Sequence, residues 1–517
     1  MAAALRLCRG VARLWQQPLL SRPPPRRAGS SGARSRLYEH AREGWASWPR
    51  LDVAGLSARM SEAERELEAR KGPLKAPELR QLVSVWERLN QVQEEIAKLS
   101  VEKNRVRTEA YNFTQSHDES TLQMLPVYNA LVKEGREIRC RLHALRQEQI
   151  ELQEKYYLDA LKLPNRIHPD VQFGDENEPR IVEIIGEKPE FDFKVKGHLE
   201  IGEKLDILRQ RRLAHISGLR SYYLCGAGAL LERALVQFTF FKLIKKGFIP
   251  MTVPDLLKGA VFEGCGILPE VHSSLVYSID PSRFEDLNLA GTSEVGIAGY
   301  FADHAVALKD LPVRIVCSST CYRAETQTGK EPWGLYRVHQ FNKVEMFGVT
   351  ANETGFESSA LMEEFLALQK EIFLELGLHY KVLDMPPHEL GLSAFRKFDI
   401  EAWMPGRNQY GEISSLSNCT DFQSRRLNIM YYDEKQQLSF AHTVNGTACA
   451  IPRMVIAILE SNQLKDGSVQ IPSVLQPLMG AEVITKPSHV LLKYIGPNQF
   501  KKGKKPIWKT QNECFGE

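Results

Sequence analysis

Charged side chains recur in segments that otherwise have the composition of buried strands, and they are the strongest chemical signal in the sequence. Arg323 and Glu325 end one such segment, and Arg337, Phe341 and Glu345 follow in the next. Charges on core strands are costly unless each has a partner. A polar cavity for a multiply charged ligand provides partners, because guanidinium groups pair with phosphate or carboxylate and Glu pairs with ammonium or Mg²⁺. The even spacing of the last three predicts that an unbroken strand places them on one face.

Two further segments must help to position this chemistry. Residues 410–460 read as two strands and then a helix that opens at Pro452–Arg453, and residues 222–259 read as strand, long helix and strand ending at Pro254. The sequence contains no GxxxxGK[ST], HExxH or GxSxG motif, and its GxG at 226–228 lacks the third glycine of a dinucleotide fingerprint. A bound nucleotide is therefore held by neither a Walker-type loop nor a dinucleotide fingerprint.

The composition predicts a globular protein of two or three domains. The chain has 517 residues, 43% of them hydrophobic and 25% charged. Its apolar runs stay shorter than the ~18 residues of a membrane span, so we expect no stable membrane association. The net charge is +3, but the basic residues are concentrated near the N-terminus and leave the rest mildly acidic. Nucleic-acid contacts then need local basic patches.

The first 38 residues contain arginine, alanine, leucine, serine and proline without Asp, Glu or Lys. Arg6, Arg9 and Arg13 recur at helical spacing among apolar residues, which is typical of a mitochondrial presequence. A disordered basic tail is the alternative. Nine cysteines without a paired pattern favour reduced thiols, and we interpret Cys317 and Cys321 as buried strand thiols in preference to a zinc site.

Two heptad-like stretches predict a helical hairpin. Apolar residues recur at alternating three and four spacing over 78–108 and again over 127–162, with the polar run 112–121 between them. Such stretches fold back as an antiparallel coiled coil, which Pro164 ends. A protruding arm of this kind serves as a dimerisation element, a spacer or a reader of a long partner such as RNA, and the arm alone does not decide among them.

Several motifs together resemble one enzyme family. They are TSE at 292–294, YRAE at 322–325, YRVHQFNKVE at 336–345, EISSLSNCTDFQSRR at 412–426 and NGTACAIPR at 445–453. Together with residues 222–259, the segments that contain them resemble motifs 1, 2 and 3 of class II aminoacyl-tRNA synthetases, in the wording of seryl-tRNA synthetases. The helical hairpin, PNRIHPDV at 164–171 and FDIEAWMPG at 398–406 resemble the same family. The basic first segment and tail make the chain similar to its mitochondrial form.

The resemblance implies serine activation by ATP, followed by transfer to tRNA(Ser). It assigns ATP binding to Arg323, Ala324, Glu325, Arg337, Val338, Phe341, Glu412, Ile413, Ser414, Ser415 and Arg453. It assigns L-serine binding to Thr292, Ser293, Glu294, Arg323, Glu345, Asn445 and Thr447. It gives the catalytic roles to Arg323, Glu345 and Arg453, and the role of Mg²⁺ ligands to Glu412 and Ser415. In this scheme Phe341 stacks on adenine, Arg337 and Arg453 hold the γ-phosphate, and Glu345 accepts the serine hydroxyl.

The resemblance also implies an α+β fold, with an N-terminal antiparallel two-helix coiled-coil arm and a six-stranded antiparallel sheet flanked by helices. It further implies a homodimer in the mitochondrial matrix. The corresponding division of the chain is a presequence over 1–38, a tRNA-binding arm with its N-terminal extension over 39–165, a catalytic domain over 166–484 and a basic tail over 485–517. A catalytically silent paralogue that binds RNA or protein is the alternative function, and it predicts damage at Arg323, Glu345, Glu412 or Arg453. All four are intact.

Two segments stay ambiguous on sequence alone. The lysine-rich tail is either a solubilising tail or a further contact to tRNA phosphates. Residues 38–78 form either a solvated helix or an RNA contact, and their excess of acids favours the solvated helix.

Overall fold

The computed structural model describes residues 35–173, 179–210, 216–269, 275–326 and 334–487. The presequence predicted over 1–38 and the tail predicted over 485–517 lie outside the described residues except for a few positions at their inner ends. The helices are α2 (Arg36–Glu43), α3 (Val53–Ala58), α4 (Met60–Arg70), α5 (Ala76–Ser116), α6 (Glu119–Met124), α7 (Pro126–Ala160), α8 (His198–Lys204), α9 (Ala227–Lys245), α10 (Gly259–Gly264), α11 (Ser293–Phe301), α12 (Glu357–Glu375), α13 (Phe422–Leu427), α14 (Ile451–Ser461) and α15 (Gln476–Met479), with 3₁₀ turns η1 (Leu308–Asp310), η2 (Pro387–Glu389) and η3 (Pro405–Arg407).

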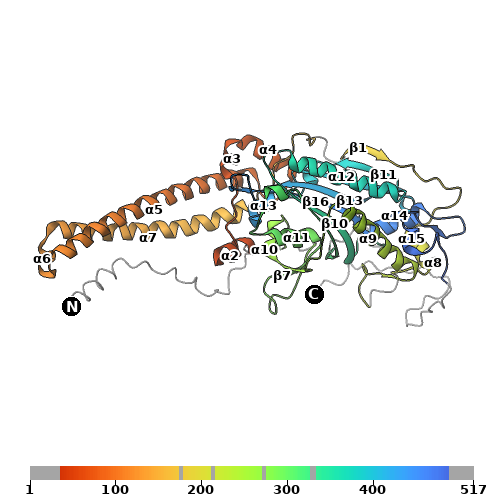
Figure 1. Ribbon diagram of the computed structural model, residues 1–517, viewed down its shortest axis with the longest axis horizontal. Helices are drawn as coiled ribbons and strands as arrows, with labels where there is room; N and C mark the ends of the chain where they lie inside the picture. Colours follow the sequence, from red (N-terminus) through yellow and green to blue (C-terminus); the bar gives the residue numbers. More distant parts are fainter. Residues whose placement is uncertain (1–34, 174–178, 211–215, 270–274, 327–333, 488–517) are drawn as a thin grey trace, which may run out of the picture.

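The strands are β1 (Arg180–Ile185), β2 (Leu208–Arg209), β3 (Tyr223–Leu224), β4 (Ile249–Met251), β5 (Leu256–Lys258), β6 (Tyr277–Ser278), β7 (Leu287–Leu289), β8 (Ala305–Ala307), β9 (Val313–Tyr322), β10 (Gln340–Thr350), β11 (Tyr380–Asp384), β12 (Arg396–Met404), β13 (Gln409–Thr420), β14 (Met430–Tyr432), β15 (Leu438–Phe440), β16 (His442–Ala450), β17 (Val469–Gln470) and β18 (Val483–Ile484). The body is thus a mixture of helices and mainly antiparallel strands, and an arm projects from one end of it (Figure 1).

One large sheet carries the body, and it is wider than expected. Its order is β1-β11-β12-β13-β16-β10-β9-β4, so the six predicted antiparallel strands gain β1 at one edge and β4 at the other. The prediction of six strands was therefore wrong in number. β4 pairs parallel to β9, which the long connection through α10 and α11 permits, because parallel neighbours need a crossover.

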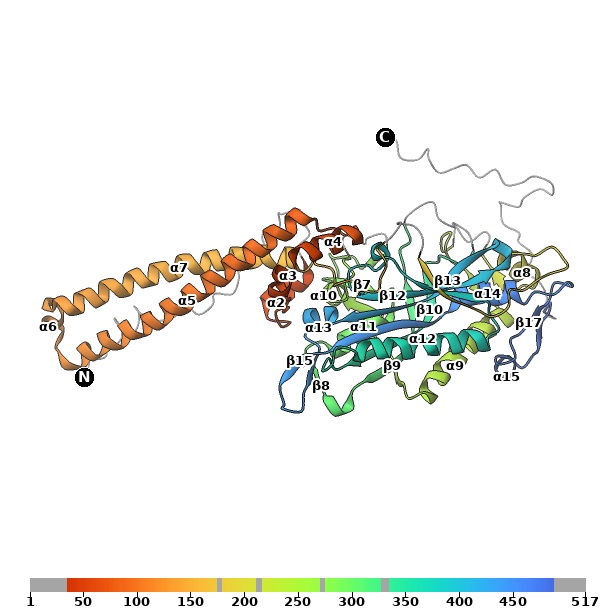
Figure 2. The same cartoon turned by 90° about the horizontal axis from the view of Figure 1, so that it is seen from above.

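The two faces of this sheet bury different side chains. Val344 and Met346 of β10 belong to the main core, which α9, α12 and α14 cover, and Figure 2 shows α9 and α12 along one side of the sheet. Phe347 and Val349 belong to a second core under α10 and α11. Because side chains alternate along a strand, Phe341, Lys343 and Glu345 share the face of this second core. They lie beyond its apolar part, at the end of β10 where the site forms.

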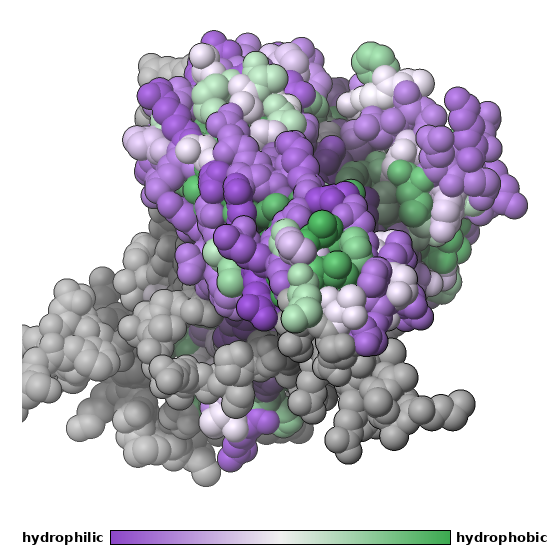
Figure 3. Space-filling view, turned by 90° about the vertical axis from the view of Figure 1, so that its left-hand side faces the viewer, coloured by the Kyte–Doolittle hydropathy of each residue, from purple (hydrophilic) through white to green (hydrophobic). Residues whose placement is uncertain are grey.

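The arm is the predicted antiparallel helix pair, α5 against α7, and the pair buries Val92, Val106 and Ile138 along its seam. The first helix is longer than predicted: it runs to Ser116 through the polar residues that we expected to break it. The hydroxyls of Thr114 and Ser116 donate to carbonyls of the preceding turn, so polar residues extend a solvent-exposed helix here. Seen from the tip of the arm, the surface is mostly hydrophilic with small hydrophobic patches (Figure 3).

The extension before the arm is packed against the body, contrary to the preference for a solvated helix. α4 buries Ala63, Leu67 and Arg70. The Arg70 guanidinium donates to the carbonyls of Gly391, Arg166 and Ala394 at 2.7 to 2.8 Å, and burial lowers its pKa to about 10. Of the acids that suggested solvation, Glu62 and Glu68 are exposed, whereas Glu66 is buried and accepts a hydrogen bond from Ile167 N–H at 3.2 Å.

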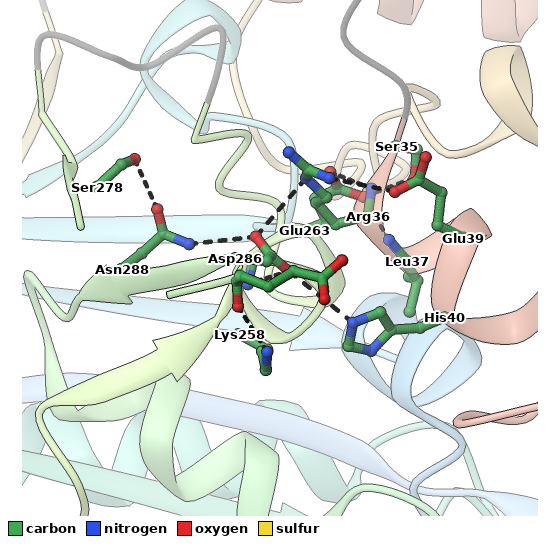
Figure 4. A network of polar contacts seen from close by, with 12 residues as sticks. Ser35, Arg36, Leu37, Glu39, His40, Lys258, Glu263, Ser278, Asp286 and Asn288 are labelled. Atoms are coloured by element: carbon green, nitrogen blue, oxygen red, sulfur yellow. Dashed lines mark hydrogen bonds and ion pairs between the residues drawn. The ribbon is translucent and has the colours of Figure 1, made fainter. Parts of the chain in front are cut away.

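The folded chain also begins earlier than the composition suggests. Glu263 of α10 is buried and accepts hydrogen bonds from the Ser35 hydroxyl at 2.6 Å and from the backbone N–H groups of Arg36 and Leu37 at 2.9 and 3.0 Å (Figure 4). The Leu37 and Tyr38 side chains are buried in α2. Residues 35–38, placed with the presequence on composition, are therefore part of the folded body.

Within the described residues, no helix has both the length and the apolar character needed to cross a membrane. The cysteines in this part of the chain are free thiols. Cys317 and Cys321 are buried on β9, which confirms their interpretation as buried strand thiols.

Candidate active site

A cavity opens where β9, β10, β13 and the start of α14 meet. Arg323 follows β9 and its guanidinium carbon lies 5.3 Å from the ring centroid of Phe341 on β10. Among the residues that the structure describes, Arg323 has no ion pair, although Arg453 and Glu412 line the same cavity. An arginine that is held against an aromatic ring and has no carboxylate partner is available to bind a phosphate or carboxylate group of a ligand.

Glu325 lies at the rim of this cavity in a strained backbone conformation, with φ of +45°. Its carboxylate is 3.5 Å from Arg337 Nη1 and 3.8 Å from Arg220 Nη1. Arg337 does not lie on β10, because that strand begins at Gln340. The expectation of an unbroken strand from Arg337 to Glu345 was therefore wrong. Residues 334–337 form turns at the base of the loop that enters β10.

Glu412 and Ser415 reach the same cavity because β13 is bulged. In a regular strand, residues three apart point to opposite faces. The pairing of β12 with β13 shifts between Ile400 and Glu401, so that Ile400 faces Ser414 while Glu401 faces Glu412, and Ile413 is the extra residue. One inserted residue restores a common face for Glu412 and Ser415. Both line the cavity.

Arg453 and Glu412 form an ion pair that closes one side of the cavity. Arg453 lies in the first turn of α14, as predicted, and its Nη1 is 3.1 Å from Glu412 Oε2. Burial raises the pKa of the Glu412 carboxyl, but the charges of Arg453, Lys397 and Arg323 outweigh burial and bring the pKa below its usual value. Glu412 therefore stays ionised at neutral pH.

Asp399 of β12 adds a second carboxylate beside this part of the site. It faces Ser415 across the β12–β13 pairing and accepts a hydrogen bond from Lys397 at 2.9 Å. Burial raises its pKa to about 6, while Lys397 lowers the pKa and Glu412 raises it. Its other oxygen, Oδ1, is buried without a hydrogen-bond partner among the described residues.

The second half of the site is a set of amides around Glu294, in the first turn of α11. Its Oε1 accepts hydrogen bonds from Asn445 Nδ2 at 2.8 Å and from Gln423 Nε2 at 2.6 Å. Desolvation and the neighbouring charge of Glu345 raise the pKa of Glu294 to about 7, although Lys343 and the Gln423 amide act in the opposite direction. A carboxylate held in this way is suited to binding an ammonium group.

A buried ion pair connects the two halves. The Lys343 ammonium contacts Glu345 and also donates to Thr292 Oγ1 at 2.9 Å. Glu345 accepts a further hydrogen bond from Thr447 Oγ1 at 3.2 Å. A carboxylate with these fixed donors is oriented to accept one more hydroxyl hydrogen bond. The geometry thus joins a phosphate-binding end with an end that recognises an ammonium and a hydroxyl.

The residues predicted to bind ATP line the cavity, except for Ala324. Of those predicted to bind serine, Thr292 and Glu345 contact Lys343 beside the cavity, and Asn445 is bonded to Glu294. Four residues differ from the prediction in detail. Ala324 does not line the cavity, and the Ser293 side chain is buried at the start of α11. Ile413 contributes its side chain to the main core. The Ser414 hydroxyl donates to Thr447 O at 2.6 Å and accepts from Gln369. At Ile413 and Ser414, only the backbone remains to face a ligand.

Besides Asp399, the site contains three residues that were not predicted from the sequence: Lys343, Gln423 and Tyr336. Lys343 lies between Phe341 and Glu345 at the same even spacing, and this spacing was a usable signal. Gln423 reaches Glu294 from α13. Tyr336 accepts from Arg453 Nε through its carbonyl and from Glu412 N–H through its hydroxyl, and its ring packs against both Arg453 and Arg407.

Comparison with known proteins gives a consistent result. A model of the class II tRNA synthetase core domain (G, H, P, S and T) matches residues 277–462. The mitochondrial serine–tRNA ligase of Mus musculus is 58% identical over 96% of this chain and 98% of its own length. The chain belongs to the serine–tRNA ligase family. The mitochondrial serine–tRNA ligase of Bos taurus is 60% identical over 92% of this chain and 91% of its own length.

Solved serine–tRNA ligases share the fold described above. The crystal structure of the seryl-tRNA synthetase from Pyrococcus horikoshii complexed with ATP has a TM-score of 0.77 at 33% identity, and covers 85% of this chain and all of that one. The cytoplasmic enzyme from Naegleria fowleri in complex with AMP has a TM-score of 0.73 at 26% identity with the same coverage. The family resemblance and the α+β fold class expected from the sequence are thus confirmed.

Proposed function

We propose that this chain activates L-serine with ATP to seryl-adenylate and transfers the seryl group to tRNA(Ser). The single observation that carries this proposal is the continuity of the two ends of the site. Arg323, without an ion pair among the described residues, lines one cavity with Arg453 at the phosphate-binding end and with Lys343 and Thr447 at the other end. Lys343 and Thr447 contact Glu345. The reaction requires the carboxylate of serine and the α-phosphate of ATP to meet at one cation.

In this proposal ATP lies against Phe341, with Arg323 at its α-phosphate. Arg337 and Arg453 hold the γ-phosphate, and Glu325 accepts from the adenine amino group. No side chain serves as nucleophile, because serine itself supplies the attacking carboxylate oxygen. Positioning and fixed positive charge accelerate such a step. The catalytic roles assigned to Arg323, Glu345 and Arg453 are therefore electrostatic and positional.

Serine is bound by its two ends. Its ammonium pairs with Glu294 near Thr292 and Asn445, and its hydroxyl donates to Glu345 beside Thr447. An alanine would leave the buried Glu345 without that donor, and a buried acceptor left unpaired costs about 1–3 kcal/mol. Hydroxyl recognition therefore separates serine from alanine. Threonine differs by one methyl group, and the shape of the site has to exclude it.

The residues near the phosphates fit Mg²⁺. Glu412 and Ser415 supply oxygen ligands on a common face, and Asp399 Oδ1, which has no hydrogen-bond partner within the described part of the chain, adds a further hard donor nearby. We assign Glu412 and Ser415 as the residues that hold the ion together with ATP oxygens. When bound, Mg²⁺ neutralises phosphate charge. The Arg453 pair keeps Glu412 ionised for this role.

The covalent steps balance without a further reactant. The serine carboxylate oxygen forms a bond to the α-phosphorus, the bond between that phosphorus and the bridging oxygen breaks, and pyrophosphate leaves. In the second step a hydroxyl of the terminal tRNA ribose attacks the seryl carbonyl carbon and forms an ester bond. The mixed-anhydride bond between that carbon and the phosphate oxygen breaks, AMP leaves with its electron pair, and the hydroxyl proton passes to the AMP phosphate or to solvent.

We assign the arm to tRNA binding and the face formed by α9 and β4 to a homodimer. Leu230, Phe241 and Ile249 are exposed on these neighbouring elements, and β4 is an edge strand with unpaired backbone groups. A second copy covers both. Antiparallel α5 and α7 carry interleaved acids and bases, so the arm contacts RNA through selected basic residues and by shape.

Because the mouse and bovine relatives are mitochondrial enzymes, the chain is assigned to the mitochondrion. We place it in the matrix, to which a presequence within residues 1–34 directs it. The division into arm, catalytic domain over 166–484 and basic tail over 485–517 is part of this proposal.

The experiment that tests the function is serine-dependent ATP–pyrophosphate exchange on the chain from Ser35 onward, with alanine and threonine in parallel. Arg323→Ala is expected to lower exchange at least about 10³-fold. Arg314→Ala is the matched control, because Arg314 lies on β9, the strand that Arg323 follows, and its partner is Glu364. Exchange that is absent in a folded wild-type chain would overturn the proposal and favour a non-catalytic RNA- or protein-binding scaffold.

A further inference from the structure

A buried polar network outside the cavity holds the loop that enters β10. Glu460, at the end of α14, has no exposed side-chain area. It accepts from His198 Nδ1 at 2.8 Å and from His198 N at 2.9 Å, and its second oxygen accepts from Gly406 N at 2.9 Å. Three donors satisfy this carboxylate inside the protein, which a buried charge requires.

His198 links Glu460 to the loop. Its Nε2 accepts a hydrogen bond from Leu335 N–H at 3.2 Å. With Nδ1 facing the carboxylate of Glu460 and Nε2 facing an N–H group, the network assigns a neutral imidazole whose proton is on Nδ1. Leu335 itself is fully buried. The histidine therefore fixes a backbone position that lies directly before Tyr336 and Arg337.

Gln210 fixes Gly334, the residue before Leu335. Its amide donates to Gly334 O at 3.0 Å and accepts from Gly334 N–H at 2.7 Å, as a paired strand would. Gly334 has φ of +86°. A Cβ at this position would lie 2.5 Å from His198 Nε2, so the close approach requires glycine.

Tyr336 depends on the same network from three directions. Its neighbour Leu335 is bonded to His198. The Arg407 guanidinium, which packs 4.3 Å from its ring, follows Gly406, which is bonded to Glu460. Arg453, whose guanidinium is 4.4 Å from the ring, lies two turns before Glu460 on α14. The supports of Tyr336 therefore converge on one buried carboxylate.

We propose that the His198–Glu460 pair and Gln210 are positioning residues for ATP, which set Tyr336 and Arg337 and through them the γ-phosphate end of the site. This inference rests on the proposed function and deepens it. We expect different effects on ATP binding and on serine binding, because the network contacts the residues just before β10 and, among the described residues, does not contact Glu294, Lys343 or Glu345.

Two substitutions of one histidine separate the contacts. Asn at position 198 can donate to Glu460 as Nδ1 does, but leaves Leu335 N–H without its acceptor. Gln at this position places its side-chain oxygen where Nε2 lies in the wild type, and this oxygen can accept a hydrogen bond from Leu335 N–H. His198→Asn is expected to raise the KM for ATP about fivefold to tenfold, the effect of losing one buried hydrogen bond, and His198→Gln is expected to return it toward wild type. The KM for serine stays within roughly twofold in both.

Gln210→Glu is the second variant, because it keeps the acceptor for Gly334 N–H and loses the donor to Gly334 O. It is expected to raise the KM for ATP in the same direction. His442→Asn is the control for loss of a buried histidine, since His442 bonds to Ser358 at the far end of β16. It is expected to change thermal stability without changing the KM for ATP.

Calorimetric binding of ATP alone, without serine, keeps this inference distinct from the proposed function. A wild-type chain that binds ATP but shows no exchange counts against the proposed function only. Equal ATP affinity in wild type, His198→Asn and Gln210→Glu overturns the positioning role, as does an equal rise in the KM values for ATP and serine. If His198→Asn does not fold, the Gln210→Glu affinity decides.

Discussion

Lys343 forms a buried ion pair with Glu345, the residue proposed to accept the hydroxyl of serine. The same ammonium donates to Thr292 Oγ1 at 2.9 Å. A buried carboxylate that accepts a substrate hydroxyl has to be held in one orientation, and the contact with Lys343 holds Glu345 in this way. The hydroxyl specificity of the site thus depends on a residue that also lines the cavity proposed for ATP.

Lys343→Met is expected to impair serine use and stability together. Removal of one partner of a buried pair leaves an uncompensated charge, at a cost of about 3–5 kcal/mol. We expect a loss of exchange of at least about 100-fold and a lower midpoint of thermal unfolding. Lys370→Met is the matched control, because it breaks a pair with Glu183 at the protein surface, where a pair is worth about 0–1 kcal/mol.

A double substitution checks that the cause is the charge on Glu345. Lys343→Met combined with Glu345→Gln removes both charges and is expected to recover most of the lost stability but none of the exchange. A double variant as unstable as Lys343→Met alone would contradict this explanation and point to lost packing around the lysine stem.

Serine affinity is expected to fall in acid because of Glu294. Its pKa is raised to about 7, so the carboxylate is mostly ionised at pH 8 and mostly protonated at pH 6. The ammonium of serine pairs only with the ionised form. The KM for serine should therefore rise about tenfold from pH 8 to pH 6, measured by exchange at saturating ATP.

Glu294→Gln provides the control for this pH dependence. The variant binds serine weakly at every pH, and its KM is expected to be flat over the same range. A wild-type KM that does not change between pH 8 and pH 6, or a Glu294→Gln variant that keeps the slope, contradicts the assignment of this titration to Glu294.

The sequence predicted the elements of the site better than their register. The strands that carry Arg323, Phe341 and Glu345 and the helix that opens before Arg453 are present as expected, because alternation and proline are local signals. The bulge at Ile413 is not visible in the sequence, although it alone puts Glu412 and Ser415 on one face. Register depends on pairing with β12, which is a long-range property.

Contacts between distant segments were the other part that the sequence did not reveal. Gln423 reaches Glu294 over 129 positions, and His198 reaches Glu460 over 262. Each of these residues reads locally as an ordinary polar residue of a helix. The buried face of α4 was missed for a related reason: its excess of acids outweighed the Ala63–Leu67 spacing, and Arg70 found carbonyl partners only through the fold.

The start of the folded chain gives a further test. A chain that begins at residue 39 lacks the three donors to Glu263 and the buried Leu37 and Tyr38 side chains. It is expected to be less stable than a chain from Ser35 by about 3–5 kcal/mol, measured by denaturant unfolding. Glu263→Gln in the longer chain isolates the carboxylate, whose pKa burial raises. Equal stability of the two chains would show that these contacts contribute nothing.

Removal of the outer arm should separate the two steps of the reaction. The base of the arm packs on the body through Leu82, Leu89 and Tyr156, so the cut must lie beyond these residues and beyond the Arg88–Glu148 pair.

We expect a short glycine–serine link from residue 95 to residue 142 to keep serine-dependent exchange within about twofold of wild type. Charging of tRNA(Ser) should fall at least about 100-fold, because the proposed RNA contacts are lost while the adenylation site is unchanged. The control for local unfolding of the arm is the intact chain with the charge at Arg105 reversed. Arg105 pairs with Glu102, Glu109 and Glu134 on the outer arm. Loss of exchange in a folded, arm-shortened chain would contradict this division between arm and body.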